Sequence, residues 1–352
     1  MLAAEKRPAK LRTLDMPTRP PGILPAILLT FVCNEELMSI LTRDNVKVIR
    51  DTPNYVEATD TPISRELKEV ATEMTRIFTS MKEDSNDPVD ITRLDDAVTT
   101  TNLPTSTLSQ TFQVLFRAIA GAILARRSQD LDPDNNSAFI LNLQNSYLQQ
   151  RNDQGSSPMF DQYRLLRGVS SVCRLCDQET LLSYNGDWFL PITHTTSDRH
   201  TELQDMIDDT ITAAHPADPQ VQAQGCQAFN CDGKTEDQEL RRFIDRPPMY
   251  LVVNLSRAQG VKHTKNIVFD VTNALTLRLD SAGRDGTRKT YEVVALLGRD
   301  AADDQKLHPQ ARVKVGQNGW ISRTRRTTRM VAVDFVNSPI QKLDMVILRR
   351  LD

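Results

Sequence analysis

The sequence contains few cysteines, few aromatic residues and no large excess of either charge. Among its 352 residues are five cysteines, and aromatic residues make up 5%. A small secreted domain held together by disulfides would need a denser set of cysteines, so this class is disfavoured. The formal net charge of −3 provides no overall field that would attract nucleic acid or an anionic membrane.

A long apolar run is absent as well. The longest run near the N-terminus, Gly22–Val32, is too short to span a bilayer. It follows a proline-rich basic segment that has no small-residue cleavage signature, so we expect no signal peptide. The sequence also has no glycine-rich phosphate loop, no metalloprotease helix and no internal repeat. We therefore expect an intracellular protein, of the cytoplasm or nucleus, with no membrane partner.

Regular apolar spacing in the first two thirds of the chain predicts helices. The clearest helix runs from Ser64 to Lys82, where apolar residues recur at three- and four-residue steps and so share one face. Thr61-Pro62 supplies an N-cap and a preset first turn for this helix. Further helices are predicted at Asn34–Arg43, Leu108–Arg126, Ala138–Gln149 and Glu202–Thr212.

Strand-length apolar runs dominate the chain after Arg246. The first, Pro247–Arg257, opens with two prolines and continues as a buried strand. Turns that contain glycine, asparagine or proline separate the later runs, which indicates an antiparallel sheet with little room for helical crossovers. These later runs are Asn266–Phe269, Leu275–Leu279, Thr290–Leu297, Gln310–Val315, Arg329–Phe335 and Asp344–Leu351.

The cysteine pairs carry the most specific chemistry in the sequence. Cys173 and Cys176 have two residues between them, and Cys226 and Cys231 have four. Either spacing lets a tight turn present two thiolates to one tetrahedral ion, and Zn²⁺ is the ion that suits four thiolates. Four protein ligands leave no open coordination position, so the predicted zinc is structural. The alternative is two unrelated pairs of reduced cysteines.

The order of these features resembles the catalytic domain of the ubiquitin-specific proteases (USPs). Leu165–Gly168, the first cysteine pair and Trp188–Ile192 resemble the entry into the fingers of that family. Pro247–Arg257 resembles the strand that opens its sheet, and His308 and Trp320 have the spacing of its histidine motif. The resemblance implies an α+β, papain-type cysteine protease fold with a helical thumb, an antiparallel β palm and zinc-ribbon fingers.

The same resemblance implies the domain organisation. Pro88-Val89 stands where the helical lobe of the family has a Pro-Val turn. Ser109–Phe116, or alternatively Asn136–Phe139, stands where the family has a Gln-Gln-Asp motif. The implied parts are a flexible N-terminal arm at 1–20, the thumb lobe at 21–158, fingers with the zinc ribbon at 159–246 and the β palm at 247–352.

The nucleophile motif of the family is eroded in this chain. A USP uses a thiolate at a helix N-terminus. Aligning Gly22-Ile23 with the start of the family motif puts Thr30 at the cysteine, and the residues between lack the Asn and Gly that shape the loop. Cys33 follows one helical turn later, so we consider it both as a nucleophile and as a buried structural thiol.

His308 matches the general base of the family by position. The acid that orients this base is expected just after the Trp motif, where the present chain has Thr324 and Arg325. An arginine beside the imidazole disfavours the imidazolium that acyl transfer requires. An active enzyme would have to use another acid, for which the candidates are Asp300, Asp303 and Asp304.

Three functions follow from these features. The first is a catalytically inactive USP-like domain that binds ubiquitin, a ubiquitin-like protein or another protein partner. The second is an active, divergent deubiquitinase, a thiol isopeptidase that uses Cys33 and His308. The third is a zinc-ribbon protein that binds nucleic acid through a basic run, although that run has no interleaved aromatic residues for base stacking. The run consists of Arg323, Arg325, Arg326 and Arg329. We favour the first function, and so expect neither catalysis nor a nucleic-acid partner.

Overall fold

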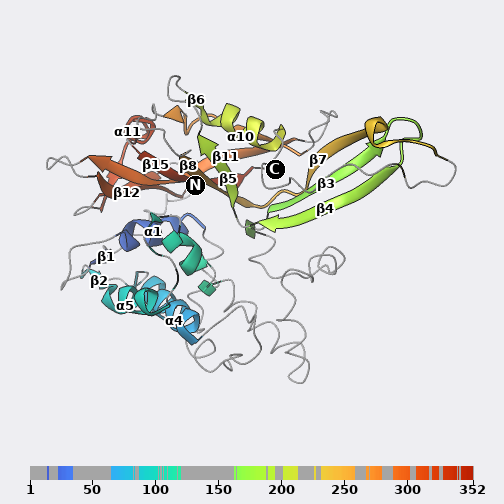
Figure 1. The fold of residues 1–352 in the computed structure, drawn as a ribbon. Coiled ribbons are helices and arrows are strands. Elements are labelled where there is room, and N and C mark those ends of the chain that lie inside the picture. Colours follow the sequence, from blue (N-terminus) through green and yellow to red (C-terminus); the bar gives the residue numbers. More distant parts are fainter. Residues whose placement is uncertain are drawn as a thin grey trace, which may run out of the picture. The chain divides into compact units, whose positions relative to one another are not determined.

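Figure 1 shows the fold of the chain as a computed structural model. The residues that the structure describes are 14–15, 23–34, 65–81, 83, 87–101, 103, 105, 107–119 without 109 and 117, 162–187 without 164, 189–194, 201–212, 226, 231–257, 267–279 without 269, 288–301, 307–316, 319–324, 328–338, 340 and 342–351. The predicted helix at Ala138–Gln149 and nearly all of the one at Asn34–Arg43 lie outside them.

The chain forms two compact units, and neither is continuous in sequence. The first contains residues 1–159 and 294–345, and the second contains residues 160–293 and 346–352. Strands β11 (Arg288–Ala301) and β15 (Lys342–Arg350) each begin in one unit and end in the other. The domain boundaries implied by the USP resemblance stay a prediction.

The first unit contains α1 (Leu24–Phe31), α4 (Arg65–Met81) and α5 (Thr92–Thr100). The described residues between 108 and 119 are helical too, as predicted. α4 confirms the predicted helix at Ser64–Lys82, and the apolar face expected for it is buried. Aromatic rings join these helices, because the ring of Phe31 stacks on Phe112 at 4.9 Å between centroids and meets Phe78 edge-on at 6.4 Å.

The strands of the first unit lie next to α1. β12 (Leu307–Val315) pairs antiparallel with β13 (Gly319–Arg323), which pairs antiparallel with β14 (Thr328–Val331). α1 packs against β12. All eight residues of α1 are buried, so this helix is an internal element of the unit.

One prediction fails in the first unit. The strand predicted at Arg329–Phe335 ends at Val331 and is followed by the short helix α11 (Val333–Asn337). The buried guanidinium of Arg312 donates to the carbonyls of Val336 and Ser338, and these contacts hold the end of α11 against β12. Within the segment predicted as an arm at 1–20, β1 (Leu14–Asp15) pairs with β2 (Val89–Asp90).

The second unit contains a three-stranded antiparallel sheet of long strands, which runs as an extended ribbon in Figure 1. β3 (Leu165–Cys173) lies between β4 (Glu179–Asp187) and β7 (Gln238–Arg246). The ring of Phe243 lies directly over Gly168, where a Cβ atom would come within 2.3 Å of it. Only glycine leaves room for this cross-strand contact.

A helix packs against some of the remaining strands of the second unit. β8 (Tyr250–Arg257) pairs with β5 (Leu190–His194), and β10 (Leu275–Arg278) pairs with β11. α10 (Leu203–Thr212), which confirms the predicted acidic helix, packs against β5 and β10. The side chain of Gln204 exchanges two hydrogen bonds of 2.7 Å with the backbone of Thr276. Two short strands, β6 (Thr201–Glu202) and β9 (Ile267–Val268), pair beside them.

Hydrogen bonding joins the strands after β7 other than β9, together with β5, into an eight-stranded sheet. Its order is β14-β13-β12-β11-β15-β8-β5, with β10 also paired to β11. β5, which precedes the runs predicted to form the antiparallel sheet, adds a parallel pairing with β8. The chain between them includes α10 and β7, and a connection of this length allows parallel pairing. The mixture of helices and mostly antiparallel sheets confirms the predicted α+β class. None of the helices described here is long and apolar enough to cross a membrane.

Candidate functional site

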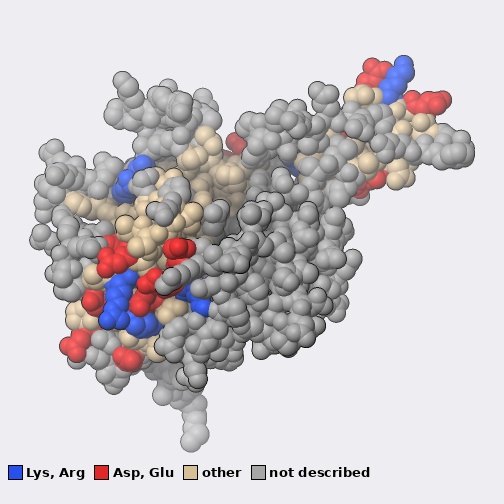
Figure 2. Space-filling model, turned by 60° about the horizontal axis from the view of Figure 1, so that its bottom comes forward, with Lys and Arg blue, Asp and Glu red and all other residues tan. Residues whose placement is uncertain are grey.

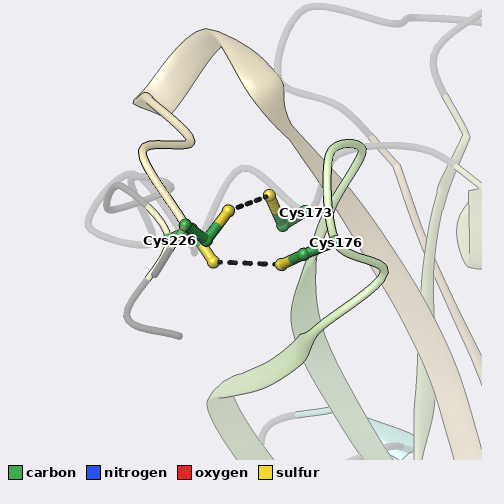
Figure 3. Close-up of side chains that lie close together, drawn as sticks. Cys173, Cys176 and Cys226 are labelled. Atoms are coloured by element: carbon green, nitrogen blue, oxygen red, sulfur yellow. Dashed lines mark hydrogen bonds between the residues drawn. The ribbon is translucent and has the colours of Figure 1, made fainter. Parts of the chain in front are cut away.

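The four paired cysteines lie together at one end of the three-stranded sheet. Cys173 is the last residue of β3, Cys176 follows on the turn toward β4, and Cys226 and Cys231 precede β7. Their sulfur atoms all lie within 4.8 Å of one another. Figure 3 shows the turn after β3 presenting its two cysteines to the opposite pair.

The distances between the sulfur atoms fit one zinc ion. Cys173 Sγ lies 3.6 Å from Cys231 Sγ, and Cys176 Sγ lies 3.5 Å from Cys226 Sγ. Tetrahedral zinc with Zn–S bonds of about 2.3 Å holds its sulfurs about 3.8 Å apart. A disulfide would need about 2.05 Å. The predicted set of four ligands is therefore brought together as a zinc site requires.

The backbone around Cys173 stabilises a thiolate. The amides of Leu175 and Cys176 point at its sulfur and, with the Leu175 amide as the largest cause, lower the pKa of the Cys173 thiol to about 6. Asp177 closes the turn with a φ of 55°, and its amide donates to the carbonyl of Cys173 at 2.8 Å. This turn can present two sulfurs because its amides face inward.

The opposite pair shows why the cluster needs a cation. The Gly233 amide lowers the pKa of the Cys231 thiol, but the neighbouring sulfur of Cys176, burial and the other two cysteines outweigh it and raise the pKa to about 12. Four thiols at this separation cannot all ionise unaided near neutral pH. A zinc ion between them removes the repulsion, and the closed set of four ligands gives it a structural role.

A glycine allows the second pair to approach the first. A Cβ atom on Gly233 would lie 2.7 Å from Cys173 Sγ and 3.1 Å from Cys226 Cβ. The carbonyl of Gly233 accepts a 2.8 Å hydrogen bond from the amide of Cys226. The amide of Arg174 donates to the carbonyl of Asp237 at 2.9 Å, which ties the first turn to the chain entering β7.

Charges of both signs surround this metal centre. Arg174 lies 3.6 Å from Glu239, and Arg241 lies 3.6 Å from Glu179. Figure 2 shows acidic and basic side chains intermingled at the end of the ribbon and over α4 and α5. On the face drawn there, the described residues form no broad field of one sign.

The start of α1 carries no nucleophile. The helix begins at Leu24 after Ile23, with Pro25 in its first turn. A USP needs a thiolate at a helix N-terminus, where the free amides and the dipole stabilise it. These side chains offer no thiol or hydroxyl. Thr30, which the alignment places at the family cysteine, lies in the last turn of α1 and donates to the carbonyl of Ile27 at 2.7 Å.

Cys33 lies beyond the opposite end of α1. Its thiol is 6% exposed and is 2.9 Å from the carbonyl of Thr30, to which it donates. The carbonyl end of a helix favours a neutral thiol over a thiolate. A donated hydrogen bond also requires the proton to stay on sulfur. The surroundings of Cys33 therefore match those of a buried structural thiol.

His308 and one candidate acid, Asp300, belong to the same unit as α1. His308 is half-buried on β12, in register with Asp300 of β11, and its strand is the one against which α1 packs. Trp320 is buried on β13, opposite Lys314 of β12. Thr324 follows that strand, while Arg325, Asp303 and Asp304 lie outside the described residues.

The basic run is partly internal. Arg323 is 6% exposed and donates to the carbonyl of Leu14 at 2.6 Å and to the hydroxyl of Thr328 at 2.8 Å. The guanidinium of the exposed Arg329 lies 5.4 Å from the centroid of the Phe335 ring. Arg325 and Arg326 lie outside the described residues. Arg323 is thus committed to holding β1, which removes it from any nucleic-acid surface.

Comparison with known proteins rests on structure alone. No family model matches the chain, and no curated protein does. Solved structures of the SAGA DUB module, which contains Ubp8, do match it. The chain has the fold of a ubiquitin-specific protease domain. A yeast SAGA DUB module matches with a TM-score of 0.60 and 12% identity, over 99% of this chain and 70% of the matched one. The Ubp8/Sgf11/Sus1/Sgf73 module bound to ubiquitin aldehyde matches with a TM-score of 0.62 and 14% identity, over 100% and 72%.

Sequence reasoning missed two features of the first unit. The helical state of Leu24–Phe31 was not predicted, since a run that is apolar on every side has no helical period to detect. The buried Arg312 was also not singled out, because arginine is ordinarily a surface residue. One signal for Arg312 is available in the sequence, namely its position between two buried apolar residues, Ala311 and Val313.

Proposed function

We propose that this chain is a catalytically inactive USP-like domain that serves as a binding scaffold in the ubiquitin system. Its partner is ubiquitin, a ubiquitin-like protein or another protein. The USP fold supports a role in this system, and the intact zinc ribbon supports retention of the fingers. The proposal separates binding, which needs only the folded surface, from cleavage, which needs a thiolate, a base and an acid in register.

One observation carries the assignment of inactivity. The first turn of α1 presents Ile23, Leu24 and Pro25, none of which can attack a carbonyl. The next thiol in the chain is that of Cys33. It is buried and donates a hydrogen bond to the carbonyl of Thr30. An isopeptidase needs a thiolate that is exposed to the substrate and activated by positive surroundings. Cys33 has the opposite environment on both counts.

The alternative of an active enzyme keeps one supporting observation. α1 packs against β12, so the segments that carry Cys33 and His308 belong to one compact unit. For catalysis, the Cys33 thiol would have to leave the Thr30 carbonyl and turn toward the imidazole. This change would break a buried hydrogen bond before any substrate bound, at a cost of about 1–3 kcal/mol for the orphaned group.

The partner class is inferred from what is bound in the similar structures. One of the matched SAGA DUB modules holds ubiquitin aldehyde, and the modules also contain Sgf11, Sus1 and Sgf73. By analogy, we propose that the present chain binds ubiquitin or a related protein and works within an assembly. The nucleic-acid alternative has less support, because Arg323 is buried and hydrogen bonded to Leu14.

The test is a ubiquitin probe with a thiol-reactive group at its C-terminus. It is applied to the zinc-loaded wild type, to Cys33→Ser and to His308→Ala, and adducts are located by peptide mapping. Zinc loading keeps the exposed Cys176 coordinated, so that it does not react in place of Cys33. Binding of unmodified ubiquitin is measured in parallel by titration.

Each outcome separates the hypotheses. We expect no adduct on any of the three proteins and measurable binding of ubiquitin. An adduct that forms on the wild type and disappears in both Cys33→Ser and His308→Ala would overturn the proposal and make the chain an active deubiquitinase. Absence of both adduct and binding would remove ubiquitin as the partner, and the same titration would then be run with ubiquitin-like proteins.

A further inference from the structure

We infer that the four-cysteine cluster is a redox-responsive site in which peroxide converts the zinc thiolates into two specific disulfides. The disulfides join Cys173 to Cys231 and Cys176 to Cys226. Each therefore links the turn after β3 to the segment before β7, and neither forms within a cysteine pair. The inference concerns the ribbon alone and stands independently of the proposed scaffold function.

All four sulfurs lie within 4.8 Å of one another, and Cys231 interacts with Cys176 and Cys226 as well, so the pairing is inferred from the two contacts of 3.5 and 3.6 Å that join the turns. The 3.6 Å contact joins Cys173 to Cys231, and the 3.5 Å contact joins Cys176 to Cys226. Figure 3 shows these as two separate contacts across the gap between the turns. A sulfur needs to move by only about 1.5 Å to reach the disulfide distance of about 2.05 Å.

The alternative pairing meets resistance from the backbone. A Cys173–Cys176 disulfide would form inside a turn whose amides at Leu175 and Cys176 are aimed at the Cys173 sulfur. That turn is also closed by the Asp177 amide donating to Cys173 at 2.8 Å and by the Cys173 amide donating to Gln178 at 3.0 Å. The sulfurs of Cys173 and Cys176 already interact, but a covalent bond between them would close a ring inside this turn at the expense of its inward hydrogen bonds.

The frame around the sulfurs does not depend on the metal alone. The amide of Arg174 donates to Asp237, and Cys173 pairs in register with Gln238 of β7. The amide of Cys226 donates to Gly233 at 2.8 Å on the other side. These bonds hold the two sides in place while the metal leaves, so the sulfurs stay matched as they oxidise.

Accessibility favours oxidation of this cluster over oxidation of Cys33. Cys176 is exposed, and Cys226 and Cys231 are partly exposed, whereas Cys33 is buried and its thiol donates a hydrogen bond to the carbonyl of Thr30. Oxidation by peroxide follows thiolate character and exposure. The cluster has both properties when it binds zinc, because zinc ligands are thiolates.

The reaction balances with peroxide as the only oxidant. A zinc tetrathiolate with charge −2, two hydrogen peroxide molecules and four protons yield two disulfides, one Zn²⁺ and four water molecules. One thiolate of each pair attacks a peroxide oxygen and becomes a sulfenic acid, and its neighbour then displaces hydroxide to form the S–S bond. Each pair loses two electrons, which reduce one peroxide.

The consequence is a ribbon that stays closed while its charge changes. Zinc and the two disulfides cross-link the same two segments, so β3 and β7 remain joined in both states. The tetrathiolate centre carries two negative charges, whereas the disulfide form is neutral. The surface beside Leu175, a side chain that is 63% exposed, therefore loses its negative neighbour on oxidation.

The test oxidises the zinc-loaded full-length protein with hydrogen peroxide. Zinc release is followed with a chromogenic chelator, and disulfides are mapped by mass spectrometry without reduction. Trypsin cleaves after Arg174 and chymotrypsin after Phe229, so the two enzymes together put the four cysteines on four peptides. We expect one zinc ion released for every two disulfides, peptide pairs that match the two predicted links, and rebinding of zinc after reduction.

Paired variants sharpen the test. The double variant Cys173→Ser/Cys231→Ser leaves one matched pair, and Cys173→Ser/Cys226→Ser leaves a mismatched one, so peroxide should cross-link the first faster. Cys33→Ser serves as the control and should release zinc as the wild type does. Disulfides within the pairs, sulfinic acids in place of disulfides, or full retention of zinc in excess peroxide would each overturn the inference. The wild-type map decides the question even if a variant fails to fold.

Discussion

Two regions of the chain that contain cysteine differ in the surroundings of their thiols. At the end of β3, four thiols from two distant segments meet within 4.8 Å and fit one zinc ion. Beyond α1, a single thiol is buried against the carbonyl of Thr30, and the start of the helix has only apolar side chains. The first region contains all four ligands of a zinc site, whereas the second is part of the core.

The difference reflects what each site contributes to folding. A structural zinc is part of the free energy of folding, so loss of one ligand is felt by the whole ribbon. A catalytic nucleophile contributes to rate and little to stability, and active sites often carry strain. In the inactive domain that we propose, no such strain is needed, and the apolar residues at the start of α1 stabilise the unit by burial. Under this proposal the fold is kept with its metal site while the start of α1 belongs to the core.

Removing a zinc ligand should have the largest effect of the tests that follow. Cys173→Ser breaks the cluster, and structural zinc sites of this kind contribute about 10–16 kcal/mol in zinc-finger peptides. We expect loss of bound zinc and fast amide exchange along β3 and β7, with exchange in α4 unchanged. Metal analysis and hydrogen exchange measure these quantities. Cys33→Ser is the control and should keep its zinc. Zinc loss in that variant would show that Cys33 also affects the metal site, against the separation of the two regions.

Shortening one buried side chain of α1 tests whether this helix belongs to the core. Ile27 has no exposed surface, so Ile27→Ala should lower the free energy of unfolding by about 4 kcal/mol through lost burial and a cavity. Urea unfolding followed by circular dichroism gives the value. The matched variant Leu175→Ala, at an exposed position, should cost less than about 0.5 kcal/mol. Equal effects of the two changes would mean that α1 is not an internal element.

Arg312 tests how the strand beside α1 is held. Arg312→Met removes the donor to the carbonyls of Val336 and Ser338 and leaves both unsatisfied in the interior. We expect a loss of about 2 kcal/mol in unfolding free energy. Arg329→Met removes only a contact of an exposed arginine with Phe335, for which about 0.5 kcal/mol is expected. If Arg312→Met proved neutral, its guanidinium would not be what secures α11.

Asp90 gives the smallest effect and adds a pH dependence. Its carboxylate accepts hydrogen bonds from the hydroxyl and the amide of Thr92 at 2.6 and 2.9 Å, and these contacts, the hydroxyl first, lower its pKa below the usual 3.8. A lowered pKa contributes stability above the unfolded value, and this is lost as the pH falls through the folded value. Since Asp90 is exposed, we expect the contribution to be no more than about 0.5 kcal/mol.

The comparison to make is between the wild type and Asp90→Asn across pH 2 to 6. Asparagine keeps an acceptor for Thr92 but does not titrate, so the variant should lose stability less steeply than the wild type at the acid end of this range. Identical pH profiles from parallel urea titrations would contradict the assignment.

Sequence reasoning succeeded where the signal is local. α4 was predicted because its apolar residues repeat at helical spacing over five turns, and the zinc ligands because two close pairs need only short turns to act together. The same reasoning supported an α+β fold of the USP type. The helical repeat and each close cysteine pair lie within a single segment, so local spacing is enough to recognise them.

The remainder depended on tertiary contacts. The pattern of Arg329–Phe335 fits a strand, yet Arg312, from a different strand, draws the carbonyls of α11 together and ends β14 at Val331. The parallel pairing of β5 with β8 requires a long excursion through α10 and β7, which no local pattern encodes. The burial of Arg323 is explained by Leu14, a partner that sequence spacing gives no reason to consider.

The contact between Arg323 and Leu14 joins residues 309 positions apart, and it has a consequence for synthesis. On the ribosome, the N-terminal segment emerges long before its partners, and at about 5–20 residues per second it waits roughly 15–60 s for them. During that interval α1, which is buried on every side in the finished molecule, has no β12 to pack against. The nascent chain thus exposes this apolar helix until β12 has emerged, and only then can the helix be buried.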